Sequence, residues 1–153
     1  MNQKLHDACK TGKFDIIDTL IENGADNWNL GLHGACKGGH MSMTEKMISC
    51  GANDWNWGFI TACKYGHFEI MERMIELGAD KWHVGLEKAC MGGHIKIVEE
   101  MLMHGAANYD MGLIFACKNN HPNIVKLMIS CGARGCSCGK SIKNHLRKLN
   151  YKQ

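Results

Sequence analysis

Apolar residues recur along this chain with the spacing of one helix face. In the segment "MSMTEKMIS", Met43, Met47 and Ile48 stand at positions i, i+4 and i+5. The same positions are apolar in three later segments: Ile70, Met74 and Ile75; Ile97, Met101 and Leu102; Ile124, Met128 and Ile129. This spacing predicts a helix of roughly three turns in each segment. A glycine follows each one, which suits a left-handed C-cap, and Pro122 stands near the first position of the last helix, where a missing N–H is harmless.

A second apolar pattern predicts another helix before each of these. In "GLHGAC", Leu32, Ala35 and Cys36 fall on one side of a helix. The small alanine and cysteine side chains let neighbouring backbones approach closely. We predict that this helix is the shorter of the two. Each repeat then consists of a short helix, a tight turn, a longer helix and a short loop.

The helix pairs repeat with a period of 27 residues. Alanine–cysteine pairs begin at residues 8, 35, 62, 89 and 116, and glycine–alanine pairs at residues 24, 51, 78, 105 and 132. Five repeats are therefore in register without an insertion. One helix pair cannot bury its apolar face alone, so neighbours must stack. The sequence predicts an all-α solenoid of five repeats over residues 1–133, followed by a basic capping helix and tail over residues 134–153.

Composition and charge are typical of a folded chain without a membrane segment. Hydrophobic residues make up 45% and charged residues 22% of the sequence, which is a globular balance. No stretch approaches the roughly 20 apolar residues of a membrane-spanning helix, and the N-terminus lacks the apolar core of a signal peptide. Nine cysteines in an unsecreted chain indicate reduced thiols, so we expect a cytoplasmic protein. The net charge of +3 conceals a tail, residues 134–153, with six bases and no acid.

The repeated segments resemble the ankyrin repeat. "GLHGACKGGHMSMTEKMISCGAN" and "GFITACKYGHFEIMERMIELGAD" follow its first helix, glycine–histidine turn, second helix and glycine–alanine ending, and so do two later segments. An ordinary ankyrin repeat has about 33 residues, so we expect the hairpin finger to be cut to a bare turn. A glycine also replaces the usual proline at the start of the first helix. These glycines are Gly31, Gly58, Gly85 and Gly112.

The resemblance implies binding of other macromolecules without catalysis. Short repeats of this kind are similar to ankyrin arrays of large DNA viruses. The sequence also lacks a nucleophile elbow, an H-E-x-x-H pair and a Rossmann glycine run. We therefore expect a non-enzymatic scaffold or adaptor that binds another protein, needs no cofactor or metal, and is a monomer in isolation. If viral, it would act in the host cytoplasm or the virion. The first alternative is a structural subunit of a larger assembly, such as a virus particle.

Three columns of equivalent residues could be either structural or reactive. Stacked helices lie about 8–10 Å apart, which is too far for disulfides between the successive cysteines of one column. We therefore expect these cysteines to be small buried hydrophobic residues. The same spacing opposes a metal shared by the histidines; by resemblance to ankyrin repeats, they brace the turn through hydrogen bonds to neighbouring backbone. The aromatic rings, expected in the shortened loops, either plug a gap, which we favour, or grip a partner. The columns are Cys9, Cys36, Cys63, Cys90 and Cys117; His40, His67, His94 and His121; and Trp28, Trp55, Trp82 and Tyr109.

Positions that break the repetition are the predicted partner-binding residues. A scaffold must repeat its core but is free to vary its surface, and the corresponding first helices and loops of ankyrin proteins line the binding face. Neutral surface variation is the alternative for each residue. The predicted residues are His33, Ile60, Tyr65, Glu87 and Ile114 on first helices, and Asp54, Asn56, Trp57, Lys81, Trp82 and His83 in loops.

The tail offers an alternative site of another class. Cys131, Cys136, Cys138 and His145 could supply four zinc ligands, although C-x4-C-x-C is not a common zinc pattern. The basic residues could contact phosphates, but basic chain ends often serve only solubility. A zinc or nucleic-acid module is therefore the second alternative, and we do not expect a nucleic-acid partner.

Overall fold

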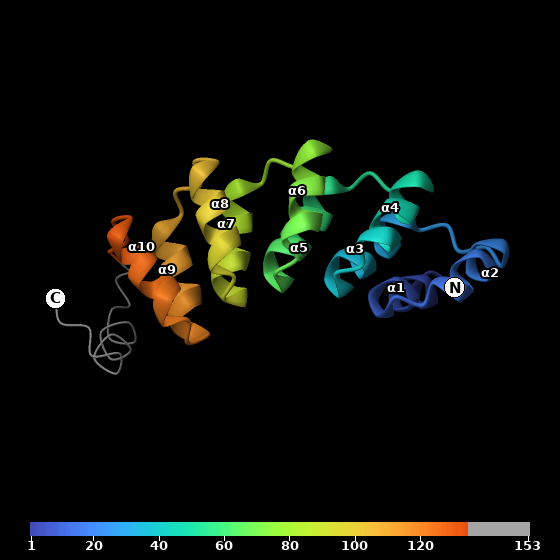
Figure 1. The fold of residues 1–153 in the computed structure, drawn as a ribbon, viewed down its shortest axis with the longest axis horizontal. Helices are drawn as coiled ribbons and strands as arrows, with labels where there is room; N and C mark the ends of the chain where they lie inside the picture. The colour runs from blue at the N-terminus through green and yellow to red at the C-terminus, as the bar shows by residue number, and fades with distance from the viewer. Residues whose placement is uncertain (135–153) are drawn as a thin grey trace. The chain divides into compact units, whose positions relative to one another are not determined.

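The computed structural model describes residues 1–134, so the capping helix and tail predicted for residues 134–153 lie outside the described residues except for Arg134. The described residues form ten α-helices and one 3-10 helix, and no strand (Figure 1). This result confirms the predicted all-α class and the helical repeat solenoid. The chain divides into two compact units, unit 1 (Met1–Lys81) and unit 2 (from Trp82 onwards).

Unit 1 contains three helix pairs. The first helices of the pairs, α1, α3 and α5, pack side by side, and α3 and α5 each pack against the second helix that follows (Figure 1). In the first pair a 3-10 helix precedes a short second helix. The elements are α1 (Asn2–Thr11), η1 (Phe14–Ile16), α2 (Ile17–Glu22), α3 (Trp28–Gly38), α4 (Met41–Ser49), α5 (Trp55–Tyr65) and α6 (Phe68–Glu76).

Unit 2 contains two helix pairs of the same kind. The first helices α7 (Trp82–Gly92) and α9 (Tyr109–Lys118) pack together, and each also packs against its own second helix. The second helices are α8 (Ile95–Met103) and α10 (Pro122–Ser130). Helix α10 begins with Pro122, as the sequence predicts.

The first helix of a repeat is the longer one, so the predicted order of lengths was wrong. Helix α5 has 11 residues and α6 has 9. The reason is that the aromatic residue expected in the loop is already the first residue of the helix, because the residue before it is an N-cap. The Asp54 side chain accepts a hydrogen bond from the Trp57 N–H at 3.0 Å, and Asn27 accepts one from the Leu30 N–H at 3.0 Å.

The glycine–alanine pair ends the second helix in the way that the sequence predicts. Gly51 has φ +109, in the left-handed region. Its N–H donates to the Ile48 carbonyl at 2.9 Å, and the Ala52 N–H donates to the Met47 carbonyl at 3.0 Å. These two bonds satisfy carbonyls that the helix end would otherwise leave open. Ala52 is buried, which explains why a small apolar residue follows the glycine.

The buried face of each second helix is rotated from the predicted one. Met43 and Met47 are buried as predicted, but Ile48 is only half-buried. The buried residue is instead the one that directly follows the first apolar residue of each predicted face. It is buried because the second helix packs against its own first helix and against a neighbouring second helix. The residues at this position are Thr44, Met71, Val98 and Val125. The cysteine column, Cys9 to Cys117, is buried, and all five thiols are free.

Asparagine side chains fasten the loop that enters the following repeat. Asn29 accepts hydrogen bonds from the N–H groups of Asn53 at 2.8 Å and Asp54 at 3.0 Å. Asn2 accepts equivalent bonds one repeat earlier, from Asp26 and Asn27. Asn56 accepts one from the Asp80 N–H at 3.0 Å. We call Asn2, Asn29 and Asn56 the asparagine braces.

Candidate functional site

Three stacked rings lie across the first helices of unit 1. The His33 ring lies 4.3 Å from the Trp57 ring, with 16° between their planes, and 5.4 Å from the His6 ring on its other side. The rings come from α1, α3 and α5, so a stack running across three repeats fixes the central imidazole. Gly34 makes this possible, because an added Cβ there would collide with the His6 carbonyl.

His33 is a neutral imidazole in a positively charged setting. Burial, together with the electrostatic effects of His6, Lys37 and Lys64, lowers the pKa of His33 to about 4. Its Nδ1 is buried and has no hydrogen-bond partner in the part of the chain that the structure describes. A neutral ring that stacks between two others has the geometry of a packing element rather than of a general base.

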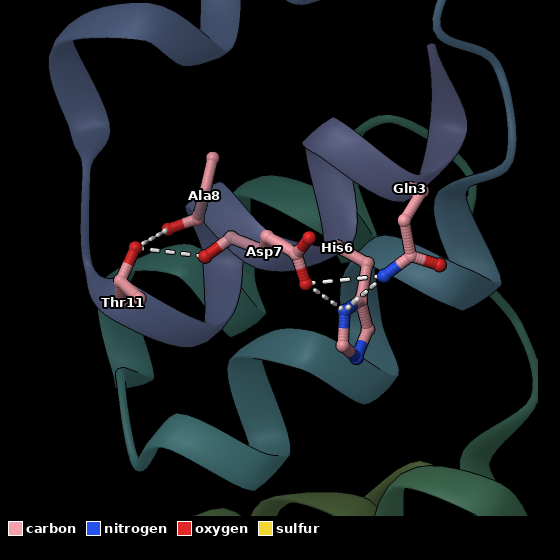
Figure 2. Close-up of polar contacts among 5 residues, drawn as sticks. All are labelled: Gln3, His6, Asp7, Ala8 and Thr11. Atoms are coloured by element: carbon pink, nitrogen blue, oxygen red, sulfur yellow. Dashed lines mark hydrogen bonds and ion pairs between the residues drawn. The ribbon is translucent and has the colours of Figure 1, made fainter.

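The His6 imidazole is held by its own helix. Its Nδ1 donates to Asp7 Oδ1 at 2.8 Å, and Gln3 Nε2 donates to the same oxygen at 3.1 Å (Figure 2). The His6 bond lowers the pKa of Asp7. Thr11 completes the group, since its hydroxyl donates to the Asp7 carbonyl at 2.7 Å. These hydrogen bonds hold the His6 ring at one end of the stack, and they give the Asp7 carboxylate two donors from its own helix.

Tyr65 lies beside two lysines at the end of α5. The Lys37 Nζ lies 5.5 Å and the Lys64 Nζ 5.4 Å from the centre of its ring, within the range of a cation–π interaction. The Tyr65 side chain remains 37% exposed, as does that of Trp57. Trp57 and Tyr65 stand at positions i and i+8 of one helix, a spacing that belongs to one broad helix face.

Together these residues form one surface on unit 1, which we call the first-helix surface. It comprises His6, Lys10, His33, Lys37, Trp57, Lys64 and Tyr65. The sequence predicted three of its members, His33, Trp57 and Tyr65, but not the others. A signal for the lysines was present, because Lys10, Lys37 and Lys64 each follow an alanine–cysteine pair at the same place in the repeat.

Other predicted partner-binding residues of unit 1 have internal roles or lie at its margin. Asp54 caps α5, and Asn56 is an asparagine brace. Ile60 is half-buried on α5. Lys81 is exposed and lies 3.5 Å from Asp80. Capping and bracing occupy side-chain atoms of Asp54 and Asn56, so these two residues contribute to the local fold.

The remaining predicted residues belong to unit 2. Glu87 accepts a hydrogen bond from Asn108 Nδ2 at 2.9 Å. Trp82 stacks on His104 with ring centres 4.3 Å apart and 11° between planes. His83 is exposed on α7, and Ile114 is half-buried on α9.

The histidine column lies at the turns. His67 Nε2 donates to the Lys37 carbonyl of the preceding repeat at 3.2 Å, and His121 Nε2 donates to the Met91 carbonyl at 3.1 Å. Both rings thus contact neighbouring backbone, as the resemblance implies. The aromatic column, Trp28, Trp55, Trp82 and Tyr109, is half-buried throughout. This exposure does not decide between rings that fill a gap in the fold and rings that contact a partner.

The described residues show no cluster of three or more side chains that could hold a metal ion. Of the zinc ligands considered in the sequence analysis, only Cys131 lies among the described residues.

A hollow of about 280 Å³ lies at the turns of unit 1. Its ionisable lining residues are His67, which is bonded to backbone, and Glu69. None of the described helices has the length and apolar character needed to cross a bilayer.

Stacked helix pairs define the class of helical repeat proteins. The chain matches the family model described as "Ankyrin repeats (3 copies)" over residues 5–85 and again over residues 60–142. It therefore belongs to the ankyrin repeat family. Repeats of this family generally mediate protein–protein interaction and are typically non-enzymatic. No curated protein matches the chain.

Proposed function

We propose that this chain is a non-catalytic scaffold or adaptor that binds another protein through the first-helix surface. The observation that carries the proposal is the exposure of Trp57 and Tyr65, each 37% exposed on one face of α5. Tryptophan and tyrosine are enriched among residues that dominate binding energy. An exposed aromatic pair on a regular helix is the kind of anchor that a protein partner uses.

The stacking within the surface favours rigid recognition. Trp57 is fixed against His33, and Tyr65 lies beside two lysine side chains. Side chains that are ordered before binding lose less entropy when a partner arrives. This preorganisation supports a binding role, because the rings are already held in place by unit 1 itself.

Crosslinking before lysis, followed by affinity purification from the native source, would identify the partner. The affinity of the purified pair is then measured for Trp57→Ala/Tyr65→Ala and for the control Phe14→Ala. Phe14 is also an exposed aromatic residue of unit 1, at 43%, but it lies in η1. We expect the double variant to weaken binding at least about tenfold and the control to leave it unchanged. Equal affinities for all three proteins would refute the proposal.

The proposal also includes the other predicted partner-binding residues and the setting in which the protein would act. Ile60 and Lys81 would contribute to binding from unit 1, and Glu87, Ile114, Trp82 and His83 would contribute from unit 2. A monomeric adaptor in the cytoplasm of a virus-infected cell is the setting that the repeat type favours. If the chain is instead a subunit of a virus particle, the same surface would be covered there, and the protein would be recovered from purified particles.

A further inference from the structure

The first helices of unit 1 carry a row of lysines. Lys10, Lys37 and Lys64 occupy the same position in successive repeats, 27 residues apart, in the last turn of α1, α3 and α5. These helices pack side by side (Figure 1). Neighbouring helices lie about 8–10 Å apart, so the three ammonium groups form a line across unit 1. Lys10 and Lys64 are exposed, and Lys37 is half-buried.

The charges of unit 1 are segregated between its two sets of helices. The first helices α1, α3 and α5 contain four lysines and one acid, Asp7. The second helices α2, α4 and α6 contain six acids and two bases. Asp7 already accepts hydrogen bonds from His6 and Gln3. The first helices therefore carry an excess of positive charge that their own acid does not balance.

Both bases of the second helices of unit 1 form ion pairs with acids of those helices. Lys46 pairs with Asp18 at 3.0 Å, and Arg73 pairs with Glu45 at 2.8 Å, both between second helices. Arg73 also pairs with Glu76 of its own helix at 3.0 Å, and Lys81 pairs with Asp80 at 3.5 Å in the loop before α7. On the first helices, the ammonium groups of Lys37 and Lys64 lie beside the ring of Tyr65. The positive charge that they produce also contributes to the lowered pKa of His33.

We propose that the first-helix surface binds an acidic segment of the partner protein. Its carboxylates would pair with Lys10, Lys37 and Lys64, while an apolar side chain between them would pack on Trp57 and Tyr65. This inference rests on the proposed function and adds the chemical class of the partner. Lysine rows attract carboxylates over a distance of about a Debye length, and exposed rings supply the apolar contact at short range.

The test uses the full-length chain and fluorescent peptides. The probe is a short peptide of glutamate and leucine, compared with the same peptide in which glutamine replaces each glutamate, and with a single-stranded RNA oligonucleotide. The variant is Lys37→Gln/Lys64→Gln. Its matched control, Lys96→Gln/Lys126→Gln, removes the same charge from exposed positions on the second helices α8 and α10. Circular dichroism and thermal unfolding verify that both variants keep the fold.

We expect the glutamate peptide to bind, and the glutamine peptide to bind much more weakly. The surface variant should weaken binding of the glutamate peptide by about tenfold, whereas the control should change it little. The affinity of the wild-type chain should fall with added salt, and that of the surface variant should fall less. Tyr65→Ala should weaken binding as well, because the apolar contact is lost.

Four results would overturn the proposal: no binding of the glutamate peptide, equal binding of both peptides, equal loss in both double variants, or tighter binding of RNA through the same lysines. The last result would assign the surface to nucleic acid. A failure of this inference can be told apart from a failure of the proposed function. If a crosslinked partner protein depends on Trp57 and Tyr65 but not on Lys37 and Lys64, the protein-binding function stands and the acidic class is wrong.

Discussion

The imidazole of His67 lies over Gly39, the glycine that ends the first helix of the preceding repeat. An ideal Cβ on Gly39 would lie 2.5 Å from His67 Cε1. The same arrangement joins His121 to Gly93 at the same distance in unit 2. Each of these histidines therefore requires a glycine one repeat earlier. The glycine–histidine turn is a contact between neighbouring repeats as well as a feature of each one.

We predict that Gly39→Ala destabilises the protein more than Gly24→Ala. Both glycines have positive φ, +78 and +89, so alanine in either costs about 1–2 kcal/mol of backbone strain. Only Gly39 has a side chain against it, since nothing lies within 4 Å of a Cβ on Gly24. The contact should add about 1–3 kcal/mol. Chemical denaturation measures the difference, and equal losses would mean that the ring moves aside freely.

A double-mutant cycle attributes this cost to the imidazole. His67→Ala removes the hydrogen bond to the Lys37 carbonyl at 3.2 Å and should cost about 1–3 kcal/mol by itself. In that background the excess cost of Gly39→Ala over Gly24→Ala should disappear, because no ring remains to collide. Additive losses in the cycle would show that the two residues are independent.

Asn29→Ala should lower the free energy of unfolding by about 1 kcal/mol. The substitution removes the acceptor of the Asn53 and Asp54 N–H groups, which solvent can partly replace because the site is exposed. Asn29→Asp retains the acceptor oxygen and should retain most of the stability. Equal destabilisation by both variants would contradict a role for the oxygen. Denaturant titration gives the comparison.

The neutral state of His33 predicts a pH dependence of stability. The pKa of its imidazole is lowered from 6.5 to about 4 in the folded chain. Above about pH 6.5 the imidazole is neutral in both states. As the pH falls from 6.5 towards about 4, the unfolded chain takes up a proton that the folded chain does not, so stability decreases. Below about pH 4 both states are protonated and this loss ends.

The test of this dependence compares the wild-type chain with His33→Gln. The free energy of unfolding is measured across this pH range for both proteins. The wild-type value should fall more steeply, because glutamine does not titrate. Parallel curves would show that His33 is protonated equally in both states.

The buried cysteines should react slowly with alkylating reagents. Burial raises the pKa of Cys36 and of Cys90 to about 12 in each case, so little thiolate is present near neutral pH. Cys50 is half-buried, at the C-cap of α4. With iodoacetamide at about pH 8, Cys50 should be modified at least about a hundredfold faster than Cys36 or Cys90. Peptide mapping by mass spectrometry measures the rates, and similar rates in the native protein would contradict the burial.

The periodicity of the chain was sufficient to predict the helix pairs, their register and the left-handed glycines. It did not predict the boundary at the aromatic column, because the N-cap oxygens of Asn27 and Asp54 decide where the helix begins. It also did not reveal the asparagine braces. Asn56 was interpreted as a variable loop residue, although Asn2, Asn29 and Asn56 follow one another at intervals of 27 residues.

The candidate site was partly predictable for a different reason. Departures from repetition pointed to His33, Trp57 and Tyr65, which lie on one surface. The lysines beside them were overlooked because they are regular: Lys10, Lys37 and Lys64 repeat with the scaffold. A row of equal charges arises from repetition itself, so a search for exceptions misses it. The stack of His6 on His33 depends on the close approach at Gly34, which no spacing in the sequence indicates.

The asparagine braces have a consequence for how such a chain can change in length. Each brace reaches the backbone 24 or 25 residues ahead, just before the next first helix. A single residue inserted into that loop would move the backbone N–H groups out of hydrogen-bonding distance of the asparagine side-chain oxygen. Gain or loss of a whole 27-residue module would instead preserve every brace. The length of the connecting loop is thus held by hydrogen bonds, and growth or shortening of the array is restricted to complete modules.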